Sequence, residues 1–298
     1  MAPWVPHFLQ SLKNHTQPFT PFTFGTVDPV TSKPRCRTVI FRDFLFHDKR
    51  SNVLTFTTDL RGEKVHEITN KEGQTAPFEA CFYFPDTWEQ YRFSGECFVI
   101  SNKKLPQVKK LYGHDQDANT IKYPILSPSV CGHTEELYKY DQDEDGHKDS
   151  DRSIDVSTFS DEENVSPQLS RMSTRSSNAA PDILTPQDYR PPMSREWNLE
   201  LMRQWVSLSR STKSQYRKPD PGTPMTSETS SKLDKIQRGV DGGKENTGLE
   251  NFGVVCLCVD QVDYLNLKDG KGGERWMFRR LVEDETGLEV WEEEEVCP

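Results

Sequence analysis

Residues 55–68 read TFTTDLRGEKVHEI and change their hydrophobic period halfway. The first half alternates as a β-strand does, and the second half is typical of the first turns of an α-helix. Two hydroxyls and two cations lie at this joint: Thr57, Thr58, Arg61 and Lys64. The unpaired N–H groups of a helix start, together with such cations, favour phosphate. Taken alone, the stretch fits a solvated turn better, because it has neither a P-loop nor a GxGxxG pattern.

Short strands surround this stretch in the first 125 residues. Five segments rich in β-branched and aromatic residues are separated by polar loops, namely FTPFTFGTV, RCRTVIFRDFLF, NVLTFTT, FEACFYF and QYRFSGECFVIS. Short strands at regular spacing predict a barrel or a sandwich. Gly95 inside the fifth strand predicts a bulge or a close backbone approach.

Two segments are too polar to pack. Residues 141–163 carry a net charge of −8 of the chain's −10, and a Ser- and Pro-rich stretch follows them. Hydrophobic residues make up only 33% of the chain, and its mean hydropathy is −0.78. Such segments cannot bury enough apolar surface to offset the entropy of ordering. We therefore expect residues 140–192 to be an acidic, Ser-rich disordered insertion and residues 218–250 to be a flexible linker.

A helix and a second group of strands complete the chain. Four apolar residues recur at helical spacing within residues 193–217 and predict a helix that packs on the barrel. They are Trp197, Leu201, Trp205 and Leu208. Residues 251–298 return to strand patterns but have too little apolar content for a core of their own. We expect them to complete the sheet that residues 1–139 begin, which gives a mainly β (α+β) fold.

Composition argues against several classes of protein. The chain has no run of eighteen apolar residues, so we expect no membrane span. Its acidic balance and the lack of a basic stripe argue against nucleic acid. Its histidines lack the spacing of a metal motif, so we expect no metal. Seven cysteines without a CxxC pair indicate a reducing compartment, the cytoplasm or alternatively the nucleus.

Two motifs beside the opening stretch add further polar groups. RTVIFR places Arg37 and Arg42 at the two ends of a strand, and WEQYRFSG places Gln90 at the start of another. A glutamine there can read the amide and carbonyl edge of a flavin or a base. The simpler interpretation of Gln90 is a rim residue that is hydrogen-bonded to water.

The order RTVIFR, FTTDLRGEK, EQYRFSG resembles the pyridoxamine 5′-phosphate oxidase-like family of FMN-binding split β-barrels, and most of all its Alr4036-type branch. The closing RWMFRR, followed by Trp291 and Pro298, is similar to the last strands of that family. REWNLELMRQWVSLSRSTKSQYRKPDPGTP resembles the helix and loop of the branch. The resemblance implies a split β-barrel of about six to eight antiparallel strands with a few peripheral helices and two disordered insertions. It also implies FMN as cofactor and a homodimer, because the flavin lies at a dimer interface in this family.

The resemblance assigns roles along the flavin. By this resemblance the ring and the ribityl chain lie along Arg37, Thr38 and Val39. The ring edge or the phosphate contacts Thr57 and Thr58, and the phosphate is clamped by Arg61 and Lys64. The polar ring edge faces Gln90, and the flavin also contacts Ser209 and Arg279. Ser207 fits as well as Ser209. Arg42 and Arg275 match substrate-binding positions, and no catalytic residue can be assigned.

Three departures from the oxidase pattern weaken a role in vitamin oxidation. Gly62 and Glu63 stand where the pattern has a serine and an arginine, and Met277 replaces a substrate-binding histidine. FMN binding is therefore better supported than the oxidation of pyridoxamine phosphate.

Three functions remain open at this point. The first is an FMN-dependent oxidoreductase of unknown substrate, which could be a small phosphorylated molecule. The second is a genuine pyridoxamine/pyridoxine 5′-phosphate oxidase. The third is a non-catalytic barrel that acts as an interaction protein through its acidic insertion.

Overall fold

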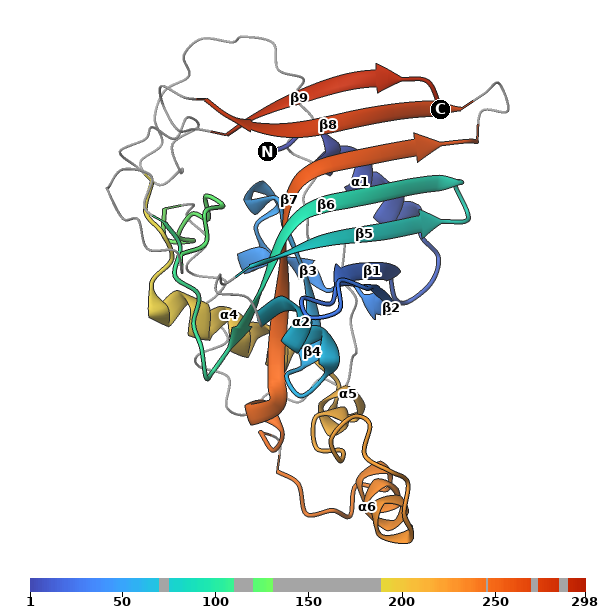
Figure 1. The fold of residues 1–298 in the computed structure, drawn as a ribbon, viewed down its shortest axis with the longest axis vertical. Coiled ribbons are helices and arrows are strands. Elements are labelled where there is room, and N and C mark those ends of the chain that lie inside the picture. The colour runs from blue at the N-terminus through green and yellow to red at the C-terminus, as the bar shows by residue number, and fades with distance from the viewer. Residues whose placement is uncertain (70–74, 110–119, 131–188, 245, 269–272, 284–288) are drawn as a thin grey trace.

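The computed structural model describes residues 1–69, 75–109, 120–130, 189–244, 246–268, 273–283 and 289–298. Within these ranges a nine-stranded antiparallel sheet forms the centre of the protein (Figure 1). Of the acidic insertion predicted for residues 140–192, only the last four residues belong to the described part. No helix in the described part is long and apolar enough to cross a lipid bilayer.

The predicted strands are present in the predicted order, whereas the helices at Trp4–Asn14 and Ser227–Gln237 were not predicted. The strands are β1 Pro21–Val27, β2 Pro34–Ile40, β3 Asp43–Phe44, β4 Val53–Asp59, β5 Ala76–Phe84, β6 Glu89–Ser101, β7 Phe252–Asn266, β8 Glu274–Val282 and β9 Glu289–Val296. The α-helices are α1 Trp4–Asn14, α2 Glu63–Thr69, α4 Ser194–Val206, α5 Arg210–Gln215 and α6 Ser227–Gln237. The predicted class, mainly antiparallel β with a few peripheral helices, is confirmed.

The long strand β7 joins the two ends of the chain. The strand order is β2-β1-β5-β6-β7-β4-β3, with β8 beside β7 and β9 outside β8. The first half of β7 pairs with β4, its second half pairs with β8, and β6 lies along its other side. The strands after residue 251 therefore share one sheet with those of the N-terminal part, and Figure 1 shows the bend in β7 between its two halves.

A bulge lies where this bend occurs. The register between β6 and β7 shifts between Ser94 and Gly95, so that Asp260 has no counterpart on β6. Gly95 has φ +156°, and a Cβ there would lie 2.1 Å from the carbonyl oxygen of Cys258. The bulge that the sequence predicts at Gly95 is confirmed, and its cause is the close approach of two backbones.

Each face of the sheet covers a core. The barrel interior is aromatic, and α1 inserts Phe8 among the rings of Phe41, Phe82 and Phe93. The helix α4 covers the opposite face with three residues of the predicted stripe, and the fourth, Leu208, follows the end of α4, where the predicted helix is interrupted; all four are buried. As a result, the first half of β7 is buried on both of its sides.

A buried polar network fastens α4 to the barrel. Arg203 donates to Asp43 at 2.6 Å and to both carboxylate oxygens of Glu200 at 2.8 Å. Gln204 of the same helix donates to Thr55 of β4 at 3.0 Å. Burial alone would raise the pKa of Asp43, but Arg203 and His47 outweigh it, so this pKa lies below its ordinary value.

The range 218–250, predicted as a flexible linker, contains the helix α6. Only Ile236 of this helix is buried, and the hydroxyl of Thr226 accepts the N–H of Thr229 at its start. The run of Ser and Thr does not predict a helix, because such residues favour caps and turns over helix interiors. Figure 1 shows that α6 lies at the far end of the molecule from β9.

The bulge yields a stability test. We expect Gly95→Ala to lower the free energy of unfolding by more than about 3 kcal/mol, because the added Cβ meets a backbone carbonyl that cannot move aside. Gly222→Ala is the matched control, since Gly222 also has positive φ (+83°) but no atom within 4 Å of the added Cβ. It should cost about 1 kcal/mol. Equal losses for the two variants in urea unfolding would contradict the account.

Candidate anion-binding site

The predicted strand-to-helix joint is present between β4 and α2. Thr58, near the end of β4, is buried, and the Lys64 ammonium donates to its hydroxyl at 3.1 Å. The helix α2 has only seven residues. Fewer than two turns give little helix dipole, so any affinity for an anion here depends on side chains rather than on the helix start.

Arg37 reaches the same place from the edge strand β2. Its guanidinium donates to the hydroxyl of Thr26 at 2.6 Å and to the carboxylate of Glu67 at 2.5 Å. It also lies 5.7 Å from the centre of the Phe24 ring, at the rim of the barrel interior. These contacts use two of its five N–H groups. Arg37, Thr58 and Lys64 are called the cationic pole below.

The two cations of the pole disfavour one another. The pKa of Lys64 lies below its ordinary value, first because of burial and then because of Arg37, although Asp59 and Glu67 act in the opposite direction. Such an arrangement carries an electrostatic cost that a bound anion relieves. The pole therefore combines two cations that act on one another with a hydroxyl that Lys64 contacts, which is the chemistry of an anion site.

Arg61, predicted as a phosphate clamp, bonds only to groups of the protein in this structure. It donates to both oxygens of Asp59, to the carboxylate of Asp220, and to the carbonyls of Tyr216 and Lys218. These five bonds use every N–H of the guanidinium. The structure therefore does not support the clamp role. Arg61 ties the β4–α2 loop to the segment after α5.

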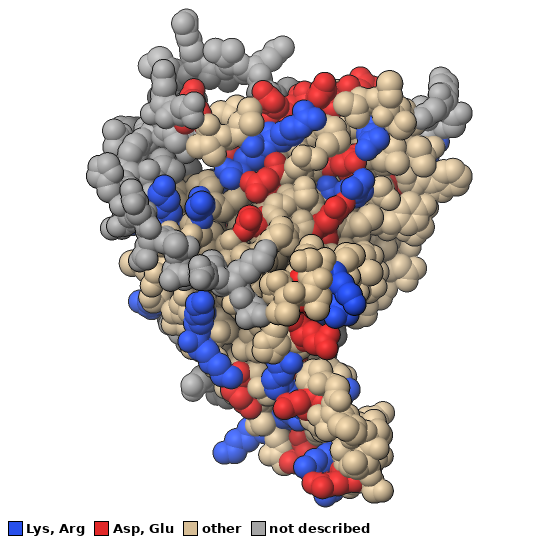
Figure 2. All heavy atoms as spheres, in the orientation of Figure 1, with Lys and Arg blue, Asp and Glu red and all other residues tan. Residues whose placement is uncertain are grey.

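Other predicted residues lie on the outer face of the sheet. Gln90 alternates with the buried Tyr91, and Arg279 follows the buried Phe278, so both point away from the barrel interior. Arg279 is paired with Glu294 at 3.1 Å. Figure 2 shows basic and acidic side chains next to one another across this side of the molecule.

The structure places the remaining predicted residues as follows. Val39 packs against the core, Thr38 is exposed and Thr57 is half-buried. Arg42 follows β2, and its N–H bonds the carbonyl of Thr55 at 2.9 Å. Ser209 caps α5, Ser207 donates to the carbonyl of Gln204, and Arg275 forms two 2.9 Å bonds with Asp263.

One chain does not bring the predicted residues together. Gln90 lies eleven residues before Ser101, which pairs with Gly253, and Gly253 pairs with Thr58. Arg37, by contrast, lies level with Phe93 of β6, three residues after Gln90, through the pairs Arg37–Phe24, Phe24–Ala80 and Ala80–Phe93. The cationic pole and the outer group of Gln90 and Arg279 also lie on opposite faces. Within one chain they are two separate groups.

Sequence reasoning missed Thr26 and Glu67. Glu67 lies three residues after Lys64 and next to the buried Ile68, so its place on the packed side of α2 is the signal that could have identified it. Thr26 carries no such signal, because its neighbour Glu67 is distant in sequence.

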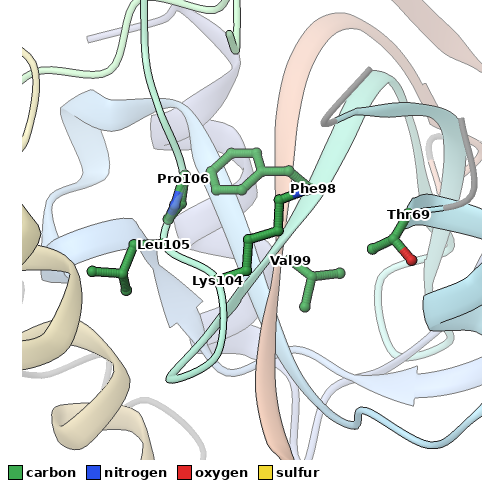
Figure 3. A pocket seen from close by; sticks show the side chains of 6 residues that line it. All are labelled: Thr69, Phe98, Val99, Lys104, Leu105 and Pro106. Atoms are coloured by element: carbon green, nitrogen blue, oxygen red, sulfur yellow. The ribbon is translucent and has the colours of Figure 1, made fainter. Parts of the chain in front are cut away.

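A small hollow lies beside α2 (Figure 3). Its lining is mostly apolar and contains none of the predicted flavin residues. The lining residues are Thr69, Phe98, Val99, Lys104, Leu105 and Pro106. Within the described ranges, no three His, Cys, Asp or Glu side chains are grouped as metal ligands.

Comparisons with known proteins agree with this architecture. A model of the family "Pyridoxamine 5′-phosphate oxidase, FMN-binding domain" matches residues 1–101. The uncharacterized protein YGR017W of Saccharomyces cerevisiae is 50% identical over 315 aligned residues, covering 100% of this chain and 99% of the yeast protein. Pyridoxine/pyridoxamine 5′-phosphate oxidase 2 of Arabidopsis thaliana is 38% identical over 81 residues, 27% of this chain and 37% of the plant protein.

A solved structure shows the same fold. The pyridoxamine 5′-phosphate oxidase-related, FMN binding protein of Nostoc punctiforme matches with a TM-score of 0.54 at 21% identity, covering 100% of this chain and 99% of its own. The fold class is thus a split β-barrel. The chain belongs to the pyridoxamine 5′-phosphate oxidase-like family of FMN-binding domains. The predicted family and its cofactor type, FMN, are confirmed, while the Alr4036-type branch stays a prediction.

The strain at Lys64 leads to a stability test. Because burial and Arg37 lower the pKa of Lys64 from 10.5, the folded chain releases this proton at a lower pH than the unfolded chain. The charged form therefore opposes folding, and this cost disappears as pH rises through the lowered pKa towards 10.5. We expect Lys64→Met to raise the melting temperature of the ligand-free protein at pH 7, and the gain to shrink by pH 10.

The control for this test is Lys232→Met, since Lys232 forms an exposed pair with Glu228 on α6. It should change the melting temperature little, because exposed ion pairs contribute little. Scanning calorimetry at several pH values measures both variants. A lower melting temperature for Lys64→Met at pH 7 would refute the electrostatic cost.

Proposed function

We propose that this protein binds FMN with the phosphate at the cationic pole and serves as a flavin-dependent oxidoreductase. The observation that carries the proposal is the pole itself, where Arg37 and Lys64 repel one another beside the hydroxyl of Thr58. A phosphate monoester brings up to two negative charges and several acceptor oxygens. It matches this set of donors.

In this proposal each residue of the pole contributes a different interaction with the phosphate. Lys64 supplies a compact charge, and Arg37 is oriented by Glu67 and Thr26, with N–H groups left over for the ligand. Arg61 keeps the loop in shape through its bonds to Asp59 and Asp220. FMN, when bound, supplies hydride transfer, and the protein supplies orientation and electrostatics.

The separation of the cationic pole from Gln90 and Arg279 supports the proposal of a homodimer. The pole lies on the inner face at one end of the sheet, whereas Gln90 and Arg279 lie on the outer face. A second copy related by a twofold axis can bring its outer group to the pole of the first copy. In this arrangement the flavin ring lies between two chains.

The substrate is left open by these residues. Arg275, predicted to bind substrate, is held by Asp263, and Met277 on the same strand offers no proton. Nothing on β8 therefore favours oxidation of pyridoxine phosphate over another reaction. The proposed location, the cytoplasm or the nucleus, rests on cysteine usage alone.

The phosphate assignment is tested by FMN titration. We expect purified protein to be yellow, and Arg37→Ala and Lys64→Ala each to weaken FMN binding by about 1.5–3 kcal/mol, the value of a charged hydrogen bond. Arg61→Ala should lower the melting temperature and weaken FMN binding less than Lys64→Ala. Arg238→Ala, in an exposed pair on α6, is the control. If both pole variants bind FMN as tightly as the wild type, the phosphate does not bind at the pole.

Subunit complementation tests the shared site. Lys64→Ala damages the pole and Arg279→Ala damages the outer group, so each homodimer has two defective sites. If FMN lies between chains, mixing the two variants after dissociation creates heterodimers with one intact site. Random pairing of a twofold dimer restores roughly a quarter of all sites. Recovery of none, measured by flavin fluorescence on the remixed protein, would contradict a site shared between copies.

A further inference from the structure

The carboxylate of Glu67 is part of the cationic pole. Glu67 is 6% exposed and lies on α2 one turn after Lys64. One of its oxygens accepts from both the Thr26 hydroxyl and the Arg37 guanidinium. A buried anion thus occupies one side of the arginine that faces the proposed phosphate.

The charges around the pole can be assigned to two groups. Arg61 forms ion pairs with both Asp59 and Asp220, at 2.6 and 2.8 Å, so this first group carries one net negative charge. Asp59 also acts on Lys64. The remaining group consists of Arg37, Lys64 and Glu67. Two positive charges and one negative charge leave a single net positive charge, while a phosphate monoester brings up to two negative ones.

We infer that Glu67 is an internal counter-ion that weakens phosphate binding at the pole. The inference rests on the proposed function and deepens it. In the ligand-free protein Glu67 offsets part of the repulsion between Arg37 and Lys64. When phosphate arrives, the same carboxylate repels it, so each molecule of FMN binds against a fixed opposing charge.

A purely orienting role for Glu67 gives the opposite expectation. An orienting carboxylate holds Arg37 in place, and its loss weakens phosphate binding. A counter-ion repels phosphate, and its loss strengthens binding. Glu67→Gln separates the two, because the amide oxygen still accepts from Arg37 and Thr26 while the charge is gone.

Titration of Glu67→Gln with two flavins provides the test. We expect FMN to bind about 10-fold more tightly than to the wild type, the order expected for removing one nearby like charge at the rim of a protein. Riboflavin, which has no phosphate, should bind equally well to both proteins. Inorganic phosphate should also bind Glu67→Gln more tightly than the wild type, so at saturating FMN it should displace FMN from both proteins at similar concentrations.

A second pair of variants tests the same inference in case Glu67→Gln alone does not fold. Arg37→Gln removes the cation and leaves Glu67 buried, and Arg37→Gln with Glu67→Gln removes both charges. Against Arg37→Gln, the double variant should again bind FMN more tightly, because the repulsion by Glu67 acts on the phosphate directly. If Glu67 only orients Arg37, the double variant gains nothing.

The outcomes are distinct. Failure of the wild type to bind FMN overturns the proposed function. FMN binding by the wild type together with equal or weaker binding by Glu67→Gln overturns only the counter-ion. Tighter binding of riboflavin as well as FMN to Glu67→Gln also overturns it, since the effect then does not involve the phosphate.

Discussion

The backbone pairing of β7 with β4 and β6 is the constraint on which the structure depends. Its fifteen residues bond the last part of the chain into the middle of a sheet begun by the first. Both cores lie against this strand, since its residues alternate between the barrel interior and the face covered by α4. The position of the pole at the end of β4 follows from this pairing.

Periodic signals in the sequence account for most of the fold. The five early strands, the apolar stripe of α4 and the bulge at Gly95 are found because each obeys a local rule of period or glycine geometry. The helix α6 is missed because it buries a single residue and therefore has no apolar stripe. Its stability depends on capping and contacts that composition does not reveal.

The candidate site is only partly readable from the sequence. Residue type and motif order pointed to Lys64, which contacts Thr58, and to Arg37, which acts on Lys64 electrostatically. The real partners of Arg61 were out of reach, because Asp220 lies far along the chain and only the fold brings it to Asp59. Glu67 carries a local signal in its position beside the buried Ile68, but its bond to Arg37 was out of reach for the same reason. Long-range ion pairs decide whether a cationic side chain bonds within the protein or can bind a ligand. No local sequence pattern predicts these pairs.

The last strand limits how copies of this protein can meet. Among the described residues β9 pairs only with β8, so its other edge carries open backbone groups that could extend the sheet. Residues 292–295 are four consecutive glutamates on this edge. Two such edges would bring eight like charges side by side, which disfavours growth into a continuous ribbon. The charge of this strand thereby protects its open edge from aggregation.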